Sequence, residues 1–289
     1  MPAFTGGAGI RCGSGIAMTP AEPRKRVPRL LNPASGYLTG YTYTLNPYTG
    51  CSFGCSYCYV RRMPIAMFRN EEWGEWVDPK SFDGEDFRKE WGKALKKGPV
   101  TVFMSSATDP YQPAEYAAER TRAVLEVMAE QPPAFVLVQT RSPLVVRDME
   151  LLARLGSRVR VSMTIETDLE DIRKQLTPKA PPLASRWRAI RELREYGIPV
   201  QAAVSPLLPC SEHFTAKLAE AVERVVVDDF FRGDGSKGKR SAQLGMREQY
   251  RNLGLEELYD EQTADRFTGE LSMLMKPGTV YFGHEGFMP

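Results

Sequence analysis

Short apolar runs alternate with amphipathic stretches over most of this chain. Six segments combine β-branched and aromatic residues with continuous or alternating apolar character and are predicted to be strands, at 41–45, 100–105, 134–140, 159–165, 198–206 and 223–230. Helices are predicted between them, at 85–97, 115–130, 147–155, 168–176 and 185–196. This alternation of strand and helix with short turns is typical of a parallel α/β fold.

The number of strand–helix units narrows the architecture without deciding it. Six units are fewer than the eight of a complete barrel, which takes about 250 residues. The periodicity is compatible with an open doubly wound sheet as well as with an incomplete barrel. Either arrangement has a large core, which a chain of 289 residues can supply.

Both ends of the chain differ from this central region. Residues 1–40 are rich in Gly, Pro and Arg and are predicted to form a basic N-terminal arm, whose RKRVPR segment (24–29) either contacts phosphates or is a solvated leader. Residues 231–289 are predicted to form a C-terminal helical extension that begins with a Gly- and Lys-rich loop at 233–240. The α/β core is expected to span 41–230.

Composition places the chain among ordinary globular proteins. It is 42% hydrophobic and 26% charged, and its net charge of +2 neither favours nor excludes a nucleic-acid partner. An odd number of cysteines, five, fits a reducing cytoplasm better than a disulfide framework, so we expect a cytoplasmic protein. No signal-peptide pattern and no membrane-spanning apolar run is evident, and we expect no membrane partner.

Three cysteines lie close together in the segment that follows the first predicted strand. Residues 46–60 read NPYTGCSFGCSYCYV and place Cys51, Cys55 and Cys58 at C-x3-C-x2-C spacing. Thiolates are soft ligands that suit zinc, copper(I) and iron–sulfur clusters, and small residues let a short loop surround one centre. Three sulfurs are one ligand short of a closed zinc site or of a fully protein-ligated [4Fe–4S] cluster. A zinc site and a disulfide remain alternatives at this point.

This motif, with an aromatic residue before its third cysteine, resembles the signature of the radical S-adenosylmethionine (SAM) superfamily. The wider string, NPYxGCxxGCxYCY with SATDPYQP at 106–113, resembles the spore photoproduct lyase-like branch, and the resemblance covers about residues 41–227. It implies a [4Fe–4S] cluster on the three cysteines, with SAM chelating the fourth iron. It also implies reductive cleavage of SAM to a 5′-deoxyadenosyl radical. The fold it implies is a partial (β/α)6 TIM-type barrel, open on one side.

The turn after the second predicted strand carries polar residues, and ligands of parallel α/β folds bind at the carboxyl ends of the strands. Ser105, Ser106, Thr108 and Asp109 follow this strand. Their hydroxyls could bind the amino group or the ribose of SAM, with Asp109 as an acceptor. The alternative for Asp109 is a turn residue before Pro110.

Further cofactor contacts are expected after the later strands. The resemblance matches Arg141 to a basic residue that contacts the SAM carboxylate, a role that suits a guanidinium, although a surface salt bridge is the alternative. Ser162, Thr164 and Glu166 alternate and are predicted to face into the barrel, where ribose hydroxyls could pair with them. The resemblance matches Ser162 to a serine that contacts SAM. Ser205 is expected to close the adenine pocket through backbone groups.

The cysteine motif also carries Tyr57 and Tyr59. In spore photoproduct lyase, tyrosines at these two motif positions are implicated in relaying hydrogen to and from the cofactor radical. The alternative for Tyr59 is packing against the barrel floor, whereas packing of Tyr57 against the adenine is compatible with the relay. One departure from that branch is Ser106, which stands where the lyase has a hydrogen-donating cysteine. A serine O–H is too strong to donate hydrogen readily to a carbon radical, so this departure argues against repair of thymine dimers by that mechanism.

These observations lead to one predicted activity with open alternatives. We expect a radical SAM enzyme that abstracts hydrogen from a substrate, which is a nucleic-acid base in a lyase-like or DNA-repair-like reaction, or else a small molecule or peptide. A reductant such as flavodoxin or ferredoxin is expected to supply the electron. From a different class, the same cysteines could belong to a zinc-binding structural or nucleic-acid-binding module.

Overall fold

A computed structural model describes residues 29–233 and 235–289, so most of the predicted basic arm lies outside the described residues. The described residues build one large sheet with the strand order β1-β2-β5-β6-β7-β8-β9-β10. All neighbouring strands in it are parallel except β1, which pairs antiparallel with β2. The strands are β1 Leu31–Pro33, β2 Tyr43–Leu45, β5 Thr101–Met104, β6 Phe135–Thr140, β7 Val159–Thr164, β8 Val200–Val204, β9 Val225–Val227 and β10 Val280–Phe282.

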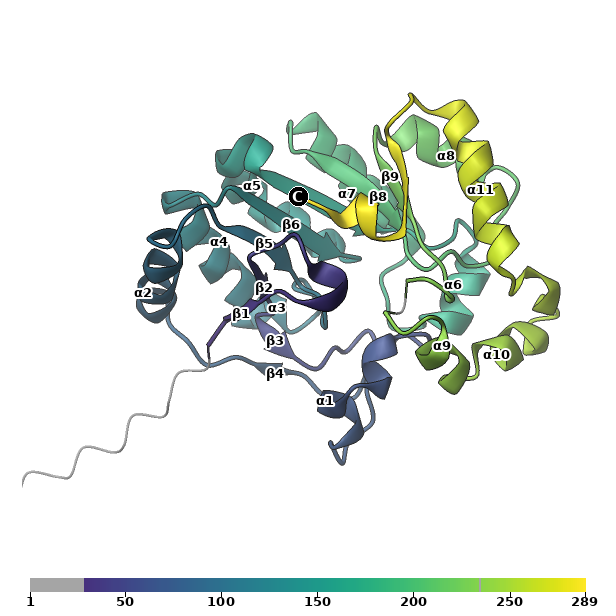
Figure 1. Cartoon of the computed structure of the whole chain (residues 1–289), viewed down its shortest axis with the longest axis horizontal. Helices are drawn as coiled ribbons and strands as arrows, with labels where there is room; N and C mark the ends of the chain where they lie inside the picture. The colour runs from purple at the N-terminus through teal and green to yellow at the C-terminus, as the bar shows by residue number, and fades with distance from the viewer. Residues whose placement is uncertain (1–28, 234) are drawn as a thin grey trace, which may run out of the picture.

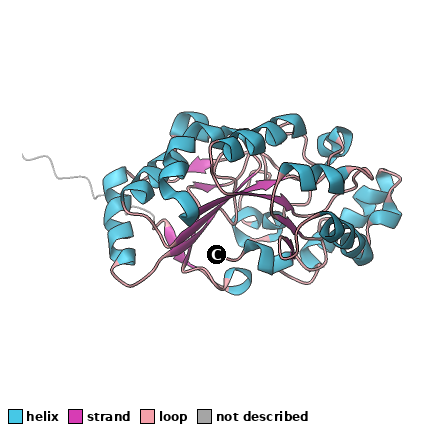
Figure 2. Cartoon of the chain, turned by 90° about the horizontal axis from the view of Figure 1, so that it is seen from above, coloured by secondary structure: helices cyan, strands magenta, loops and turns pink. Residues whose placement is uncertain are grey.

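The order of the six predicted strands decides between the two architectures. β2, β5, β6, β7, β8 and β9 are neighbours in the order of the chain, without the reversal that a doubly wound sheet requires. The strands twist across the sheet, and helices cover one of its faces (Figures 1 and 2). The prediction of a partial TIM-type barrel is therefore confirmed.

Amphipathic helices follow the strands and bury their apolar faces against the outside of the sheet. The helices of the barrel are α2 Gly84–Leu95, α3 Glu115–Ala118, α4 Arg120–Glu130, α5 Met149–Leu155, α6 Glu170–Leu176, α7 Leu183–Glu195 and α8 Phe214–Ala221. Short 3-10 helices join several elements: η1 Gly36–Leu38, η2 Tyr59–Arg62, η3 Pro143–Asp148 and η4 Gly156–Arg158. Helix α1 (Pro64–Met67) and the small hairpin of β3 (Tyr48–Thr49) and β4 (Asp78–Pro79) belong to the segment around the cysteine motif.

The helix predicted at 115–130 is broken at Glu119, whose φ of 50° lies in the left-handed region. The break has a physical reason in Glu115, which is fully buried. Its carboxylate accepts hydrogen bonds from the backbone N–H groups of Thr121 (2.9 Å) and Arg122 (3.2 Å). These are N–H groups of the first turn of α4, which would otherwise lack partners.

The inside of the barrel has an apolar floor, made of Tyr41, Phe103, Leu137, Ala203, Val226 and Phe287. The C-terminal tail, to which the sequence assigned no role, completes this floor through β10 and η6 (Gly283–Phe287). Tyr41 donates a hydrogen bond to the carbonyl of Phe287. Gly286 lies so close to Val226 that a Cβ at this position would be 2.2 Å from the Val226 Cγ2 atom.

The predicted C-terminal helices are present as α9 Lys239–Gln243, α10 Met246–Asn252, η5 Glu256–Leu258 and α11 Glu261–Leu274, and α11 packs against α8. The division of the chain at residues 40 and 230 stays a prediction, although segments on either side of the core each add a strand, β1 and β10, to its sheet. Within the described residues, no helix is long and apolar enough to cross a bilayer.

Candidate active site

A cavity of about 620 Å³ lies at the carboxyl ends of the barrel strands. The three cysteines of the motif line it together with most of the predicted cofactor residues: Ser106, Thr108, Asp109, Arg141, Thr164 and Ser205. Tyr59 also lines the cavity. The structure therefore brings together in space the end of strand β7 and residues from the turns after β2, β5, β6 and β8, as the parallel topology predicts.

The loop that carries the cysteines is held by contacts with the second motif, SATDPYQP. The side chain of Gln112 accepts a hydrogen bond from the Ser52 N–H (2.9 Å) and donates one to the Gly50 carbonyl (3.2 Å). Arg61 donates to the carbonyls of Gly54 (2.7 Å) and Cys55 (3.0 Å). The two motifs are thus parts of one structural unit. Gln112, which joins them, was not predicted from the sequence to have a role.

Glycine is required in the same loop because two chain segments meet there. Gly54 has a φ of 55°, and a Cβ on it would lie 3.0 Å from the Gly74 Cα atom. The segment of Gly74 also contains Trp73 and Trp76, which are buried and pack edge to face at 5.6 Å between ring centroids. Both rings belong to the same buried cluster as Cys51 and Cys55, so their packing supports the cysteine loop.

The thiols themselves fit an iron–sulfur cluster better than the alternatives. Cys51, Cys55, Cys58 and Cys210 are all free, so no disulfide forms among the described cysteines. Within the described residues no group of His, Cys, Asp and Glu is arranged to hold a metal as it stands, and the cavity lining includes no histidine and no fourth cysteine. Burial raises the pKa of the Cys58 thiol to about 11. Three soft donors that share one cavity, without a fourth such ligand, suit a cluster that leaves one iron for another ligand.

Asp109 is anchored by protein donors on both oxygens. Its Oδ1 accepts from the Thr140 hydroxyl (2.7 Å) and the Tyr111 N–H (2.9 Å), and its Oδ2 accepts from the Arg141 N–H (2.8 Å). Burial raises its pKa, although these hydrogen bonds act in the opposite direction. Asp109 thus fixes the end of β6, from which the Arg141 side chain projects. Its hydrogen bond from the Tyr111 N–H, two residues further on, is the contact expected of a turn residue before Pro110.

The hydroxyls beside Asp109 have fewer partners. Thr108 Oγ1 is buried without a hydrogen-bond partner, as is Ser105 Oγ. Ser106 Oγ accepts a 3.4 Å hydrogen bond from the Asn46 amide. A buried hydroxyl without a hydrogen-bond partner costs free energy. The cavity wall therefore offers hydrogen bonds to the polar groups of a ligand.

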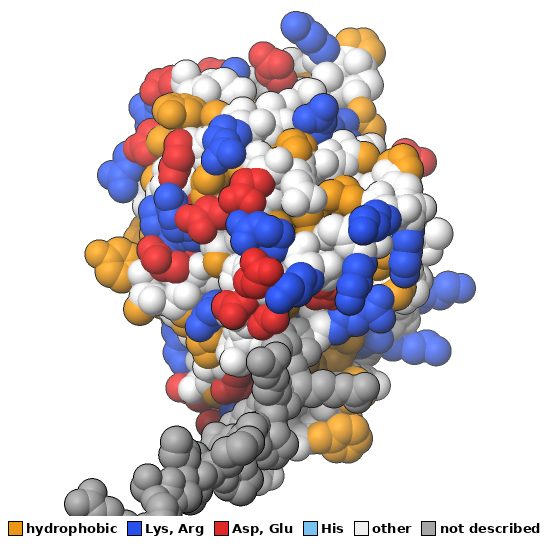
Figure 3. Space-filling view, turned by 90° about the vertical axis from the view of Figure 1, so that its left-hand side faces the viewer, with side chains coloured by type: hydrophobic (Ala, Val, Ile, Leu, Met, Phe, Trp, Pro, Cys, Tyr) orange, Lys and Arg blue, Asp and Glu red, His pale blue; other side chains and the backbone are white. Residues whose placement is uncertain are grey.

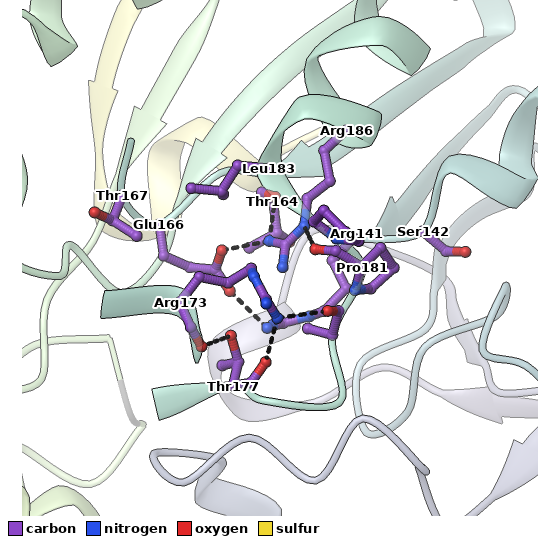
Figure 4. Close-up of polar contacts among 12 residues, drawn as sticks. Arg141, Ser142, Thr164, Glu166, Thr167, Arg173, Thr177, Pro181, Leu183 and Arg186 are labelled. Atoms are coloured by element: carbon purple, nitrogen blue, oxygen red, sulfur yellow. Dashed lines mark hydrogen bonds and ion pairs between the residues drawn. The ribbon is translucent and has the colours of Figure 1, made fainter. Parts of the chain in front are cut away.

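Arg141 is part of a buried charged network (Figure 4). Its Nη1 lies 2.5 Å from Glu166 Oε1 and 3.0 Å from the Tyr57 hydroxyl, which also donates to Glu166. Arg186 donates to the other oxygen of Glu166 at 2.6 Å. Burial alone would raise the pKa of Glu166, but the two guanidinium groups outweigh it and lower the pKa to about 2. The network therefore combines one negative charge with two positive charges.

The role of Arg186 was not predicted from the sequence, in which it resembles any other arginine of a helix. A signal was available, because Arg186 shares the apolar face of α7 with Leu183, Ala189, Ile190 and Leu193. Its side chain is fully buried and also donates to the carbonyls of Pro181 (3.0 Å) and Thr164 (3.2 Å). A charged residue on the apolar face of a helix indicates a buried partner.

The three alternating residues of β7 differ in their positions. Thr164 lines the cavity and accepts a 2.8 Å hydrogen bond from Gln139. Ser162 lies deeper, outside the cavity lining, and accepts a 3.0 Å hydrogen bond from Gln201. Glu166 is in the charged network and does not line the cavity. The predicted common face is present, but only Thr164 of the three reaches the cavity.

The two motif tyrosines are also placed differently. Tyr59 lines the cavity and donates a hydrogen bond to the Ser106 carbonyl. Tyr57 is buried behind the cavity wall, with its hydroxyl in the charged network and its ring 6.1 Å from Phe230, edge to face. Both tyrosines therefore have packing partners, and Tyr59 alone of the two faces the cavity.

Solved structures of similar fold include spore photoproduct lyases. A mutant of this lyase superposes with a TM-score of 0.65 at 13% identity, over 91% of this chain and 81% of the lyase. The lyase complexed with dinucleoside spore photoproduct gives 0.62 at 12% identity, over 92% and 81% of the two chains. Streptococcus suis SuiB bound to the precursor peptide SuiA gives 0.50 at 13% identity, over 73% and 46%. At these identities the likeness concerns the fold alone.

Similar sequences include uncharacterised proteins of Methanocaldococcus jannaschii and of Acidianus two-tailed virus. The first is 33% identical over 179 residues, which are 62% of this chain and 64% of the relative. The second is 32% identical over 177 residues, which are 58% and 56% of the two chains. The chain thus matches less than two thirds of the length of these relatives. The Radical SAM superfamily profile matches residues 45–213, more than half of the chain, and the protein therefore belongs to the radical SAM superfamily.

Proposed function

We propose that this protein is an enzyme that holds a [4Fe–4S] cluster through Cys51, Cys55 and Cys58 and cleaves SAM reductively. When bound, the reduced cluster and SAM supply a 5′-deoxyadenosyl radical that abstracts hydrogen from a substrate. The observation that carries the proposal is that three thiols from one loop share a cavity with the Arg141 guanidinium and with unpartnered buried hydroxyls. The protein binds and orients the group that carries the difficult chemistry.

Arg141 is the proposed partner of the SAM carboxylate. A guanidinium can bind a carboxylate through two parallel hydrogen bonds. The network behind Arg141 has one more positive than negative charge, so an anion in the cavity would balance it. Asp109 orients this arginine through the backbone of Arg141.

The remaining proposed cofactor contacts fall into two groups. Ser106, Thr108, Thr164 and Ser205 line the cavity, which supports direct contacts with the amino group, ribose and adenine of SAM. Ser162 and Glu166 lie behind the lining and are better suited to support neighbouring residues. The position of Tyr59 in the cavity supports a role in hydrogen relay, and Tyr57 would take part through its contacts with Arg141 and Glu166.

The substrate belongs to the same proposal. A nucleic-acid base in a lyase-like reaction is one candidate, because structures of the same fold include a lyase complexed with a dinucleoside. A peptide or small molecule is the second, because the fold also occurs in a protein bound to a precursor peptide. Fold does not decide between them. The enzyme would act in the cytoplasm with flavodoxin, ferredoxin or a similar reductant.

Metal analysis with electron paramagnetic resonance tests the cofactor. Anaerobically reconstituted protein is expected to be brown and to contain about four irons and four sulfides per chain, and its reduced signal should change when SAM is added. A colourless protein with bound zinc would instead support the structural module. Candidate substrates carrying deuterium then show which of them transfers label into 5′-deoxyadenosine.

A further inference from the structure

A layer of polar side chains lies between the apolar floor of the barrel and the rim that carries the cysteines and Arg141. Ser105, Gln139 and Asp228 come from β5, β6 and β9 or directly follow them, and all three line the cavity. Gln139 stands two residues before Arg141 on the same strand. At about 3.3 Å per residue, it lies roughly 6 to 7 Å farther into the barrel. The layer is thus between the rim with the cysteines and the apolar floor.

Two residues of this layer have buried polar atoms without partners. The Ser105 side-chain oxygen has none, and the residue is 3% exposed. Gln139 donates from Nε2 to Thr164 at 2.8 Å, which leaves its Oε1 buried and unpaired. Unpaired buried acceptors cost free energy until a ligand supplies a donor.

Asp228 adds a carboxylate to the layer. Its oxygens accept from the Tyr37 hydroxyl (3.3 Å) and from the Asp229 N–H (2.9 Å). No cation pairs with it among the described residues, since the neighbouring Arg232 pairs with Asp229 and Asp265. The carboxylate lies against Gly233, where a Cβ would be 2.2 Å from it.

The two arginines that line the cavity are both engaged with residues of its rim. Arg141 contacts Glu166 and Tyr57, and the Arg240 guanidinium lies over the Tyr59 ring, 6.0 Å from its centroid. An anionic group placed deep in the cavity would meet the charge of Asp228 without compensation. A group with N–H donors would satisfy Ser105, Gln139 and Asp228 at once.

We propose that Ser105, Gln139 and Asp228 bind a part of the substrate that donates N–H hydrogen bonds and carries no negative charge, such as the exocyclic amine of a nucleobase or the amide of a peptide. This inference rests on the proposed function, because it assigns the deep layer to the substrate and the rim to SAM. It adds Gln139 and Asp228, which the cofactor assignment does not use, and it assigns the Ser105 hydroxyl to the substrate instead of SAM.

Calorimetric titration of the SAM-bound holoenzyme without reductant tests the assignment. The probes are cytidine, which carries an exocyclic amine, uridine, which carries a carbonyl oxygen in its place and an N–H at N3, and N-acetylglycinamide as the peptide amide. At pH 8, where Asp228 with its pKa of about 7 is ionised, the wild-type protein should bind cytidine about tenfold more tightly than uridine, as a hydrogen bond to a charged acceptor allows. Binding of the amide probe alone would assign the site to a peptide. Asp228→Asn should remove the preference for the donor-rich probe, and Ser105→Ala and Gln139→Leu should weaken its binding several-fold.

The matched control is Gln201→Leu, because Gln201 also faces the barrel interior but lies outside the cavity lining. It should keep both the preference and the affinity, and thermal melting identifies any variant that does not fold. The assignment is overturned if the wild-type protein binds no probe, if Asp228→Asn keeps the preference, or if these variants weaken SAM as much as the probe. Each of these results can occur in a protein that still cleaves SAM, so they are separable from failure of the proposed function.

Discussion

Arg186 and Glu166 form a buried ion pair, with 2.6 Å between Arg186 Nη1 and Glu166 Oε2. Arg186 comes from helix α7, and Glu166 follows strand β7. Through its other oxygen Glu166 contacts Arg141, the residue proposed to bind the SAM carboxylate. A side chain on the outer layer of the barrel therefore determines how a cavity residue is held.

Removing Arg186 should leave Glu166 with less compensation for its buried charge. We expect Arg186→Met to reduce the free energy of unfolding by about 3 to 5 kcal/mol, as for other broken buried pairs. Urea denaturation measures this change. The matched control is Arg188→Met on the same helix, where the side chain is 67% exposed and pairs with Glu192, and where a loss of less than about 1 kcal/mol is expected. Equal losses of unfolding free energy in the two variants would show that the buried ion pair stabilises the protein no more than the exposed one does.

Arg141→Ala should weaken SAM binding more than it lowers the iron content. The guanidinium is proposed to contact the carboxylate of SAM, whereas the cluster depends on the cysteine loop, which Arg61 and Gln112 hold. Loss of a charge-assisted pair of hydrogen bonds is expected to lower the affinity at least tenfold. Equilibrium binding and iron analysis on the same preparations measure both quantities. A parallel loss of affinity and iron would indicate a structural role for Arg141.

The pH dependence of stability should change in Asp228→Asn. Burial raises the pKa of Asp228 from 3.8 to about 7, and the charge of Asp229 acts in the same direction, whereas hydrogen bonds from Asp229 and Tyr37 oppose it. Between these values the folded protein holds a proton that the unfolded chain has lost, so this residue makes stability fall as the pH rises from about 4 to 7.

Each pKa unit corresponds to about 1.4 kcal/mol, so the difference between the wild type and Asp228→Asn should grow over this interval. Urea denaturation without SAM at pH 4.5, 6 and 7.5 follows the difference directly. The comparison also removes the contribution of Glu166, whose lowered pKa acts in the opposite direction at lower pH. Stability curves that stay parallel would contradict the proposed environment of Asp228.

Gly286→Ala tests whether the C-terminal tail is part of the barrel core. A methyl group at this position would be 2.2 Å from Val226 Cγ2, so we expect a loss of about 1 to 3 kcal/mol in the free energy of unfolding. Gly269→Ala in helix α11 is the control, because nothing lies within 4 Å of its Cβ position and alanine favours a helix by up to about 1 kcal/mol. A tail that contributes little to the core would tolerate both changes.

The strands and the cysteine loop could be predicted from the sequence because their signals are local. Apolar runs such as 134–140 and 159–165 end directly before polar turns, and parallel topology brings these turns together. Strands β1 and β10 gave no such signal, since each has only three residues and depends on pairing with a neighbouring strand, β2 or β9. The break at Glu119 was also missed, because it depends on how the buried Glu115 carboxylate meets helix α4.

The site shows the same division between local and distant information. The C-x3-C-x2-C spacing is visible in one short segment, whereas Arg186 and Asp228 reach the site from helices and strands later in the chain. Period-2 alternation predicted one face for Ser162, Thr164 and Glu166, but it carries no information on depth along the barrel axis. Ser162 therefore lies below the cavity with Gln201.

Reductive cleavage of SAM by the wild type and by Cys55→Ala tests the central claim most directly. With dithionite under anaerobic conditions, the reconstituted wild type should release 5′-deoxyadenosine, and Cys55→Ala should release none while its circular dichroism shows a folded chain. Cys210→Ala is the matched control and should keep the activity, because Cys210 packs outside the cavity lining. Absence of 5′-deoxyadenosine from the iron-loaded wild type, or its continued release by Cys55→Ala, would contradict the account.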